Sequence, residues 1–212
     1  MCGRVFIDPG DGYFRDLAEY INRSPLMAKM NGTLPLNADG VYGGEVPPGS
    51  VMPVLAPNRA GEQAVFPMKW GFSLPGGEGK RPGTVINART ETAAVKPLFR
   101  DLWKQRRCVI PASAYFEWEH YMGFDGKPKT GRKYKIRPAE GKRTCLAGLY
   151  RIEDGIPAFV VLTRAPSAEL FRIHDRMPLM IPEEAVGEWL SPTGRAEEVA
   201  ARALTDTVME AV

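Results

Sequence analysis

The sequence contains little cysteine and little histidine: 3 Cys and 2 His among 212 residues. Three cysteines are too few for a disulfide framework, and their odd number favours a reducing compartment. The cysteines also lack the paired spacing of metal ligands, which together with only two histidines argues against a structural zinc site. We therefore expect no metal and no other cofactor.

Long apolar runs are absent as well. No window approaches the roughly 20 apolar residues that a membrane span needs, and the N-terminus lacks the basic and then apolar pattern of a signal peptide. The chain is therefore expected to be a cytoplasmic protein without a membrane partner. We also expect a monomer.

What the sequence does contain is a large apolar fraction, 44%, together with 22 Gly and 19 Pro. This length and composition fit one turn-rich domain over residues 1–212 that buries a full core. The pattern favours an α+β or mostly β protein over a helical bundle. We expect an antiparallel β core with helices on its outside.

Charge is unevenly placed along the chain, although the net charge is only +3. Residues 80–107 hold eight Lys or Arg against two acids, and residues 127–143 hold eight against one. The last thirty residues hold seven acids against two basic residues. A charged run is often only a solvated face. Two basic runs beside aromatic residues nevertheless make a polyanion such as nucleic acid the leading partner class.

The first part of the chain predicts a strand, a helix and a loop. Residues 2–7 read as a short strand. Apolar residues at helical spacing, from Phe14 to Ile21, predict a helix for which Asp11 is the N-cap. Residues 23–50 are rich in Gly, Pro and Asn and predict a long ordered loop, a feature that is often functional.

The remaining elements follow from apolar runs bounded by turn residues. Strands are predicted at 51–56, 63–68, 84–88, 108–110, 115–119, 132–136, 145–150 and 158–163. A surface loop is predicted at 73–83 and a helix at 94–105. Two short helices are predicted near the C-terminus, with Pro182 and Pro192 in their first turns.

Four residues are candidates for chemistry. Removal of Met1, which a small second residue favours, would leave Cys2 with an α-amine two carbons from its thiol. His174 lies in a polar turn, although a lone histidine is more often structural. Glu117 lies in an aromatic strand, where it is either buried with a partner or directed to water by strand alternation. Asn87, in an apolar strand, either serves the site or holds a neighbouring loop.

Six motifs occur in the order seen in one family. They are Met1-Cys2-Gly3-Arg4, Trp70-Gly71, Asn87-Ala88-Arg89-Thr90-Glu91-Thr92, Arg107-Cys108-Val109-Ile110-Pro111-Ala112, Phe116-Glu117-Trp118 and His174-Asp175-Arg176-Met177-Pro178. The chain resembles the SRAP (SOS response-associated peptidase) family from residue 2 to about residue 190, followed by a predicted C-terminal helix over 191–212. The resemblance implies a single domain with antiparallel sheets that form a partly open, barrel-like core.

The same resemblance implies an abasic-site processing protein, nucleoid-associated in a bacterium, that binds single-stranded DNA and links Cys2 to the abasic sugar. The catalytic positions it implies are Cys2, Asn87, Glu117 and His174. The DNA-contacting positions it implies are Arg4, Trp70, Arg89, Trp118, Thr163 and Arg176.

The chain departs from the family pattern at three places. Gly44-Glu45 stands where a Tyr-Asn pair is usual, and an acidic residue beside phosphate argues against a DNA contact from this loop. Thr163-Arg164 replaces a Thr-Thr pair, and Ala114 replaces a glycine.

Two other functions remain open at the level of sequence. In an N-terminal-nucleophile thiol peptidase or amidohydrolase, the Cys2 amine is the base for its own thiol. In a non-covalent single-strand binding module, Cys2 has no chemical role. The strong basic asymmetry argues against the first, and the acid, histidine and asparagine that accompany Cys2 argue against the second.

Overall fold

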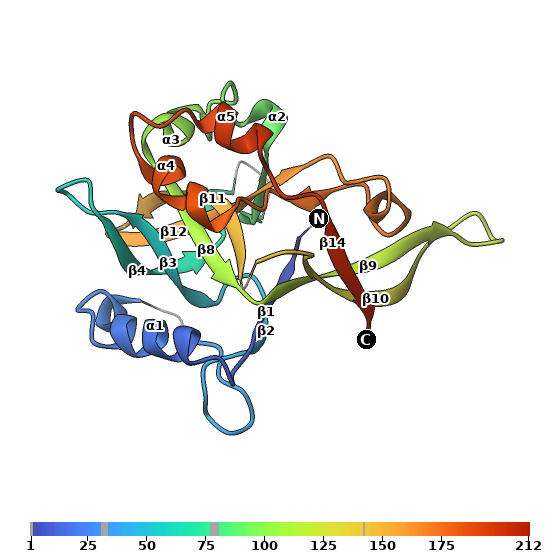
Figure 1. Cartoon of the computed structure of the whole chain (residues 1–212), viewed down its shortest axis with the longest axis horizontal. Helices are drawn as coiled ribbons and strands as arrows, with labels where there is room; N and C mark the ends of the chain where they lie inside the picture. Colours follow the sequence, from blue (N-terminus) through green and yellow to red (C-terminus); the bar gives the residue numbers. More distant parts are fainter. Residues whose placement is uncertain (1, 31–33, 77–80, 142) are drawn as a thin grey trace.

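The computed structural model describes residues 2–30, 34–76, 81–141 and 143–212. Two large β-sheets form the centre of the protein and helices lie on the outside (Figure 1). Most strand pairs are antiparallel, and β12 pairs in parallel with β4 and β7. The predicted α+β fold with an antiparallel core and peripheral helices is confirmed.

Five strands close into a barrel. They are β3 (Val51–Pro57), β4 (Gln63–Trp70), β8 (Arg107–Ala112), β11 (Thr144–Glu153) and β12 (Ile156–Arg164). The order is β11-β8-β3-β4-β12, and β12 pairs again with β11. The barrel-like core that the resemblance implies is present, and its ring of strands is complete.

Successive residues along the barrel strands alternate between two apolar clusters, as strand geometry requires. Ile110 and Val161 belong to a cluster that also contains Phe14. Their neighbours Val109 and Val160 belong to a second cluster. The first cluster is tightly filled, because a Cβ at residue 148 would lie 2.6 Å from the Cδ1 of Ile110. The glycine at that position therefore lets the strands approach.

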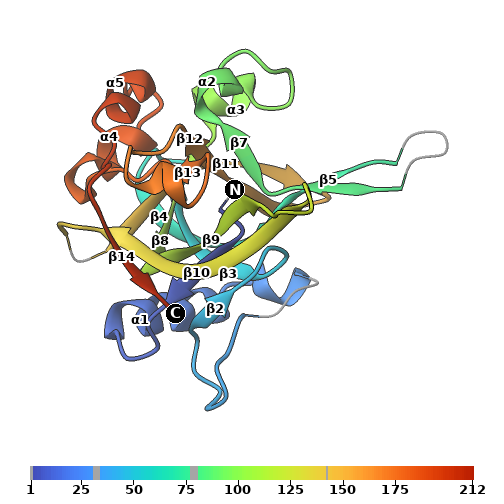
Figure 2. The same ribbon diagram turned by 90° about the vertical axis from the view of Figure 1, so that its right-hand side faces the viewer.

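Helices cover the barrel from two opposite sides (Figures 1 and 2). One side carries α1 (Gly12–Asn22), whose N-terminus is capped as predicted: the Asp11 side chain accepts a hydrogen bond from the Tyr13 N–H at 2.9 Å. The other side carries α2 (Thr90–Ala93), α3 (Arg100–Gln105), α4 (Val186–Leu190) and α5 (Ala196–Ala201). Short 3₁₀ turns lie at η1 (Met27–Lys29), η2 (Leu170–Arg172) and η3 (Glu183–Ala185).

The second sheet has the order β14-β10-β9-β1-β2. Its strands are β1 (Arg4–Ile7), β2 (Gly44–Val46), β9 (Ala114–Met122), β10 (Pro128–Pro138) and β14 (Thr207–Ala211). Only Ser113 separates β8 from β9, so one stretch of chain contributes to both sheets. This continuity places β1, and with it the N-terminus, next to the barrel.

The prediction of a C-terminal helix over 191–212 is wrong. Within that range α5 ends at Ala201, and β14 then pairs with the outer edge of β10. An uncovered edge strand presents unpaired backbone groups, and β14 satisfies those of β10. Pro182 is the N-cap residue directly before η3, and Pro192 lies ahead of the first turn of α5, so neither proline lies within a first turn.

Three further predictions need correction. Of the helix predicted over 94–105 only α3 forms, because Pro97 disfavours helical conformation at the residue before it. The loop over 23–50 contains η1 and β2, and residues 31–33 within it lie outside the described residues. The ends of the predicted loop at 73–83 are strands, β5 (Phe72–Leu74) and β6 (Gly83–Val85), and residues 77–80 likewise lie outside the described residues.

The predicted strand at 84–88 is shared between β6 and β7 (Asn87–Arg89), which pair with different partners. The last strand, β13 (Met177–Pro178), also pairs with β12. Within the described ranges no helix has the length and apolar character needed to span a membrane.

Candidate active site

Cys2 lies in the interior of the protein, just before the start of β1. β1 pairs with β9 so that Arg4 lies opposite Phe116 and Val5 opposite Tyr115. Cys2 is fully buried, at 0% exposure. Burial, reinforced by the charge of Glu117, raises the pKa of the Cys2 thiol well above its ordinary value. At neutral pH the thiol is therefore protonated.

Asn87 contacts Cys2 directly. Its Nδ2 donates a hydrogen bond to the Cys2 carbonyl at 2.9 Å, from a strand that pairs with β12 at Val161. The Asn87 Oδ1 is buried and accepts no hydrogen bond from the described residues. The side chain therefore fixes the Cys2 backbone and keeps one acceptor available inside the site.

Trp70 supports the position of Asn87 indirectly, through β7. It is 1% exposed, its ring stacks on Phe159 at 5.9 Å between centroids, and its Nε1 donates to the Ile86 carbonyl at 3.1 Å. Ile86 directly precedes Asn87. In this structure Trp70 offers no ring face to a base, and its contacts instead position β7.

Glu117 lies on β9 and points inward, being 2% exposed. The interpretation that strand alternation turns it to water is therefore wrong. Burial raises its pKa from 4.5 to about 7, and the nearby Asp175 carboxylate acts in the same direction. A carboxyl group with this pKa can both give and accept a proton at neutral pH.

His174 follows η2 and is half-buried. Its Nδ1 accepts a hydrogen bond from the Arg176 backbone N–H at 3.1 Å and lies 2.8 Å from an Asp175 carboxylate oxygen. These two neighbours fix the orientation of the ring. Burial lowers the His174 pKa to about 4, His120 acts in the same direction, and Asp175 opposes it. The ring is therefore neutral at neutral pH.

Sequence reasoning missed His120. Its ring meets that of His174 edge to face, with centroids 5.0 Å apart. The backbone N of His120 also donates to the Ile173 carbonyl, which joins β9 to the His174 turn. Because the partner lies far away in the chain, no local signal marked this contact.

A cleft of about 610 Å³ opens beside Asn87. Its lining includes Asn87, Arg89, Lys96 and Thr163. Arg89 and Lys96 are exposed, and neither forms an ion pair with the described residues. Thr163 is fully buried, and its hydroxyl donates to the Ala88 carbonyl at 3.4 Å. Lys96 was not singled out from the sequence, although it lies within the first basic run.

The opposite side of the site has a different charge balance. Arg4 forms an ion pair with Glu45 at 2.7 Å, and Lys133 contacts the other oxygen of the same carboxylate. The Lys133 Nζ also lies 4.0 Å from the centre of the Phe116 ring and 5.3 Å from that of Trp118. Two tryptophans, Trp70 and Trp118, were predicted to contact DNA. Of these, Trp118 is half-buried and has exposed surface at the rim of the site.

Arg176 is engaged within the protein. Two of its nitrogens contact the two oxygens of Glu91 at 2.7 Å each, and one also donates to the Thr163 carbonyl. Its side chain is 12% exposed. Arg176 thus joins the end of β12 to α2, and in this state its hydrogen-bonding nitrogens do not face a phosphate.

The structure therefore places the four predicted catalytic residues around one point. Asn87 contacts Cys2, the charge of Glu117 acts on the Cys2 thiol, and Asp175 beside His174 acts on Glu117. The predicted DNA contacts are not gathered in the same way, since Arg4 and Arg176 are paired, and Trp70 and Thr163 are buried.

Comparison with known families shows which family the chain belongs to. The model of the SOS response associated peptidase (SRAP) family matches residues 1–212. The chain belongs to the SRAP family.

Relatives of this SRAP protein include the abasic site processing protein YedK of Escherichia coli K12. It is 31% identical over 195 residues, which are 90% of this chain and 79% of the relative. The abasic site processing protein YoqW of Bacillus subtilis is 33% identical over 141 residues, 64% of this chain. That match spans 58% of the length of YoqW.

Solved structures share the fold of this SRAP chain. A protein from Bacteroides thetaiotaomicron has a TM-score of 0.68 at 18% identity, over 100% of this chain and 92% of that one. A phage-related protein from Bordetella bronchiseptica has a TM-score of 0.66 at 23% identity, over 100% of this chain and 94% of that one.

The described part of this SRAP chain contains no group of three or more His, Cys, Asp or Glu arranged to hold a metal ion. Its three cysteines are buried and form no disulfides.

Proposed function

We propose that this SRAP protein is an abasic-site processing protein that binds single-stranded DNA and, after removal of Met1, forms a covalent bond between Cys2 and the ring-opened abasic deoxyribose. The product is a thiazolidine that shields the lesion. The observation that supports this most is the Asn87 hydrogen bond to Cys2 beside a buried carboxyl group with a pKa of about 7. The names of the relatives YedK and YoqW support the same substrate class.

The electrophile is the aldehyde of the open abasic sugar. The free Cys2 amine adds to this carbon to give a carbinolamine, which loses water to form an imine. The thiol then adds to the same carbon, its proton passes to the imine nitrogen, and a five-membered ring closes. Only an N-terminal cysteine can form this ring, because both nucleophiles must belong to one residue.

The amine acts before the thiol in this sequence. An α-amine has an ordinary pKa of about 7.7–8.0, so part of it is unprotonated at neutral pH. The thiol is held protonated by burial and by Glu117. Imine formation therefore comes first, and thiol addition follows once the electrophile is bound next to it.

Glu117 transfers the protons of imine formation and reversal. Loss of water from the carbinolamine needs an acid at the departing oxygen, and the reverse step needs a base for the attacking water. A group with a pKa of about 7 serves both steps, and a positioned acid or base contributes about 10²- to 10⁴-fold.

His174 assists opening of the sugar ring. Its neutral ring takes the proton of the sugar hydroxyl, while the Nδ1 contacts with Arg176 and Asp175 fix the ring orientation. Asn87 orients the amine or the substrate hydroxyl through its available Oδ1. At the rim, Arg89 and Lys96 pair with phosphates and Trp118 stacks on a base.

The test is a crosslinking experiment on single-stranded DNA with one abasic site, resolved on a denaturing gel. Intact mass measurement first establishes that Met1 is absent from the purified protein. We expect a heat-stable adduct with the natural chain, none with Cys2→Ser and none with undamaged DNA. An equal adduct with Cys2→Ser would overturn the covalent mechanism.

The catalytic assignment has its own test. Glu117→Gln and His174→Ala should slow adduct formation or reversal by about 10²-fold or more while changing affinity for undamaged DNA little. Equal losses of rate and affinity would make these residues binding or folding residues. Asp175→Asn should slow the reaction less than His174→Ala, because the ring remains and only its orientation is weakened.

A further inference from the structure

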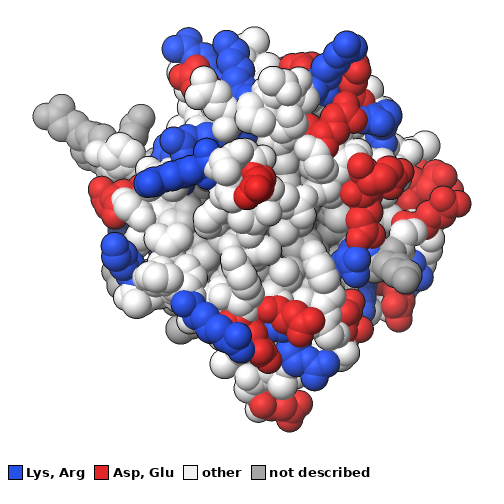
Figure 3. Space-filling model, turned by 60° about the vertical axis from the view of Figure 1, so that its left-hand side comes forward, with Lys and Arg blue, Asp and Glu red and all other residues white. Residues whose placement is uncertain are grey.

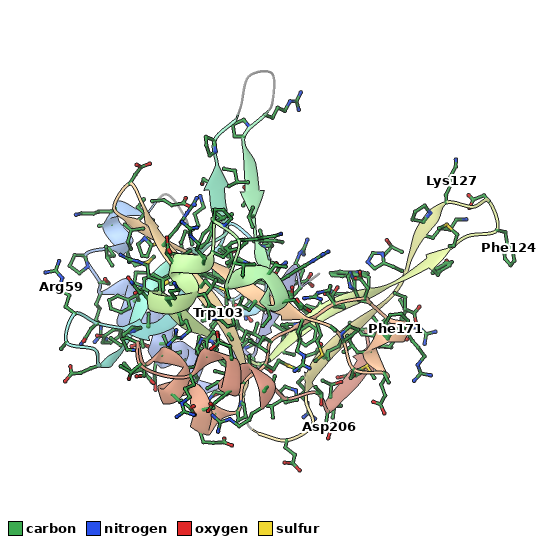
Figure 4. The ribbon with its side chains drawn as sticks, turned by 90° about the horizontal axis from the view of Figure 1, so that it is seen from above. Arg59, Trp103, Phe124, Lys127, Phe171 and Asp206 are labelled. Carbon is green, nitrogen blue, oxygen red and sulfur yellow. The ribbon has the colours of Figure 1, made fainter. Side chains whose placement is uncertain are left out.

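The hairpin at the end of β9 and the start of β10 extends away from the body of the protein (Figures 1 and 4). We call residues 119–132 the arm. Its strands pair at Tyr121 with Lys129 and at Met122 with Pro128. The turn is closed by a hydrogen bond from the Gly123 N–H to the Lys127 carbonyl at 2.9 Å. The arm is thus a regular two-stranded ribbon rather than a loose loop.

The direction of the arm is fixed at its base. The pairing register shifts between Thr130 and Lys133, as in a β-bulge, which bends a ribbon. Glu119 holds this irregularity, accepting hydrogen bonds from the Arg132 N–H at 3.2 Å and the Tyr134 hydroxyl at 2.8 Å. A Cβ at residue 131 would lie 2.8 Å from a Glu119 oxygen, so the glycine there lets the two strands close.

The arm exposes large apolar side chains that have no core to cover. Tyr121 is 53% exposed, Met122 65%, and Phe124 at the tip is fully exposed. Single exposed apolar residues are ordinary. Three within four positions, on a ribbon with a free face, indicate a surface that contacts something else.

Cations accompany these side chains. Lys127, Lys129 and Arg132 are exposed on the same ribbon. Of the two arm carboxylates, Glu119 is bound at the bulge and Asp125 lies 3.6 Å from Lys129. Aromatic faces interleaved with cations are the combination that binds a single nucleic-acid strand, by base stacking and by phosphate pairing.

The arm begins at the mouth of the active site. Its first residue is two positions from Glu117, and His120 at its root touches His174. Phe171, which is 68% exposed, lies near the root in Figure 4, whereas Phe124 and Lys127 lie at the tip. From Trp118 to Phe124 the strand rises about 20 Å. At about 3.4 Å per nucleotide of a stacked strand, this length corresponds to about six nucleotides.

We propose that the arm is a second binding zone for the nucleic-acid strand that leaves the active site, with Tyr121 and Phe124 stacking on bases and Lys127, Lys129 and Arg132 pairing with phosphates. The proposal rests on the proposed function for the identity of the ligand. It adds that contacts extend about six nucleotides beyond the lesion on the side of the arm.

The test compares strand lengths. One variant carries Tyr121→Ser and Phe124→Ser, and a second carries Lys127→Gln, Lys129→Gln and Arg132→Gln. A control variant changes Val95 to Ser and Arg59 to Gln, which are outside the arm. Binding of undamaged single-stranded DNA is measured for strands of about 5 and about 20 nucleotides, sizes chosen below and above the reach of the arm. Circular dichroism checks that each variant is folded.

We expect the aromatic variant to lose about tenfold or more in affinity for the long strand and less than about twofold for the short one. The charge variant should lower the salt slope for the long strand by about 2. Equal losses on both lengths, or no loss on either, would overturn the proposal. The proposal would also be overturned if the natural chain sediments as a dimer and the aromatic variant as a monomer, with no change in DNA binding.

Strand polarity gives a second readout. Two long strands carry the abasic site near one end or near the other, so that the remaining DNA leaves the site in opposite directions. Arm variants should slow crosslinking at limiting protein concentration for one of them only. Because binding is measured on undamaged DNA, loss of crosslinking with retained arm-dependent binding would count against the covalent function and leave the arm proposal intact.

Discussion

The two sides of the candidate active site both carry basic residues, but they differ in how much charge is available to a ligand. On the side of β7 and α2, Arg89 and Lys96 are exposed and have no ion pair among the described residues. On the side of β1, β2 and β10, Arg4 and Lys133 share the carboxylate of Glu45. The number of basic residues in a segment therefore does not measure its attraction for a polyanion.

Two glutamates show the same contrast at closer range. Glu45 is partly exposed and lies between two cations. Glu117 lies on the floor between the two sides and is almost fully buried. A glutamate carboxyl group thus neutralises nearby cations at the rim, as Glu45 does, and can give and accept protons at the buried floor, as Glu117 can. The surroundings of each glutamate decide between these two roles.

The surface farther from the site supports this interpretation. On the face that Figure 3 shows, away from the arm, acidic and basic side chains alternate around a centre that carries few charges. A polyanion is therefore not expected to bind there. The following predictions test the contrast between the two sides and the floor, beginning with the largest effect.

The floor gives the largest expected effect. The pKa of Glu117 is higher in the folded protein than in the unfolded chain. Its contribution to the free energy of unfolding is therefore fully present below pH 4.5, where the carboxyl group is protonated in both the folded and the unfolded state, and is lost as pH rises through about 7. Glu117→Gln avoids burying a carboxylate. At about pH 8 the variant should unfold at a higher temperature than the natural chain, with an unfolding free energy larger by up to about 3 kcal/mol. At about pH 4 the two should differ little.

Thermal unfolding across pH measures this difference. Glu140→Gln, at an exposed position, is the matched control and should show no such trend. A Glu117→Gln chain that is less stable than the natural one at about pH 8 would mean that the carboxylate is held by attraction rather than tolerated.

The open side gives the next effect. Arg89→Gln with Lys96→Gln should lower affinity for undamaged single-stranded DNA on the order of tenfold at low salt and reduce the salt slope by about 1.4. Binding titrations at several salt concentrations measure both. Arg59→Gln is the control. An unchanged slope would show that neither residue meets a phosphate.

The compensated side should respond in the opposite direction. Glu45→Gln releases Arg4 and Lys133, so affinity for the same DNA should rise about threefold, an effect limited by screening at a partly exposed site. The same titration detects it. A fall in affinity would indicate that Glu45 orders this side for binding.

Replacement of Arg4 should have the smallest effect on DNA affinity. Arg4→Gln should change affinity by less than about twofold in the natural chain, because its charge is already paired. In the Glu45→Gln background the same change should remove about half of the gain. If Arg4→Gln has the same effect in both backgrounds, the ion pair does not control the availability of this cation.

Much of the site follows from sequence order, since the motifs containing Cys2, Asn87, Glu117 and His174 are those of the family. The residues predicted to contact DNA differ more in their surroundings. A motif specifies that a tryptophan stands at residue 70, but only the packing of Phe159 against its ring shows that the ring is buried. Arg176 is similar, because Glu91, which binds it, is 85 positions away.

The same division holds for the fold. Local patterns predicted α1 with its Asp11 cap and most barrel strands, since capping and strand alternation depend on neighbouring residues. They missed β14 and predicted a helix in its place, because β14 forms on an edge that β10 provides from far along the chain.

The sequence by itself determined the candidate residue Cys2, its proposed companions by family order and the two basic runs. The tertiary structure decided which of those groups are buried, paired or available. The physical reason is that burial and ion pairing depend on groups that approach only when the chain folds. Glu117 obtains a pKa of about 7 from its surroundings, and Arg4 is neutralised by a carboxylate 41 residues away.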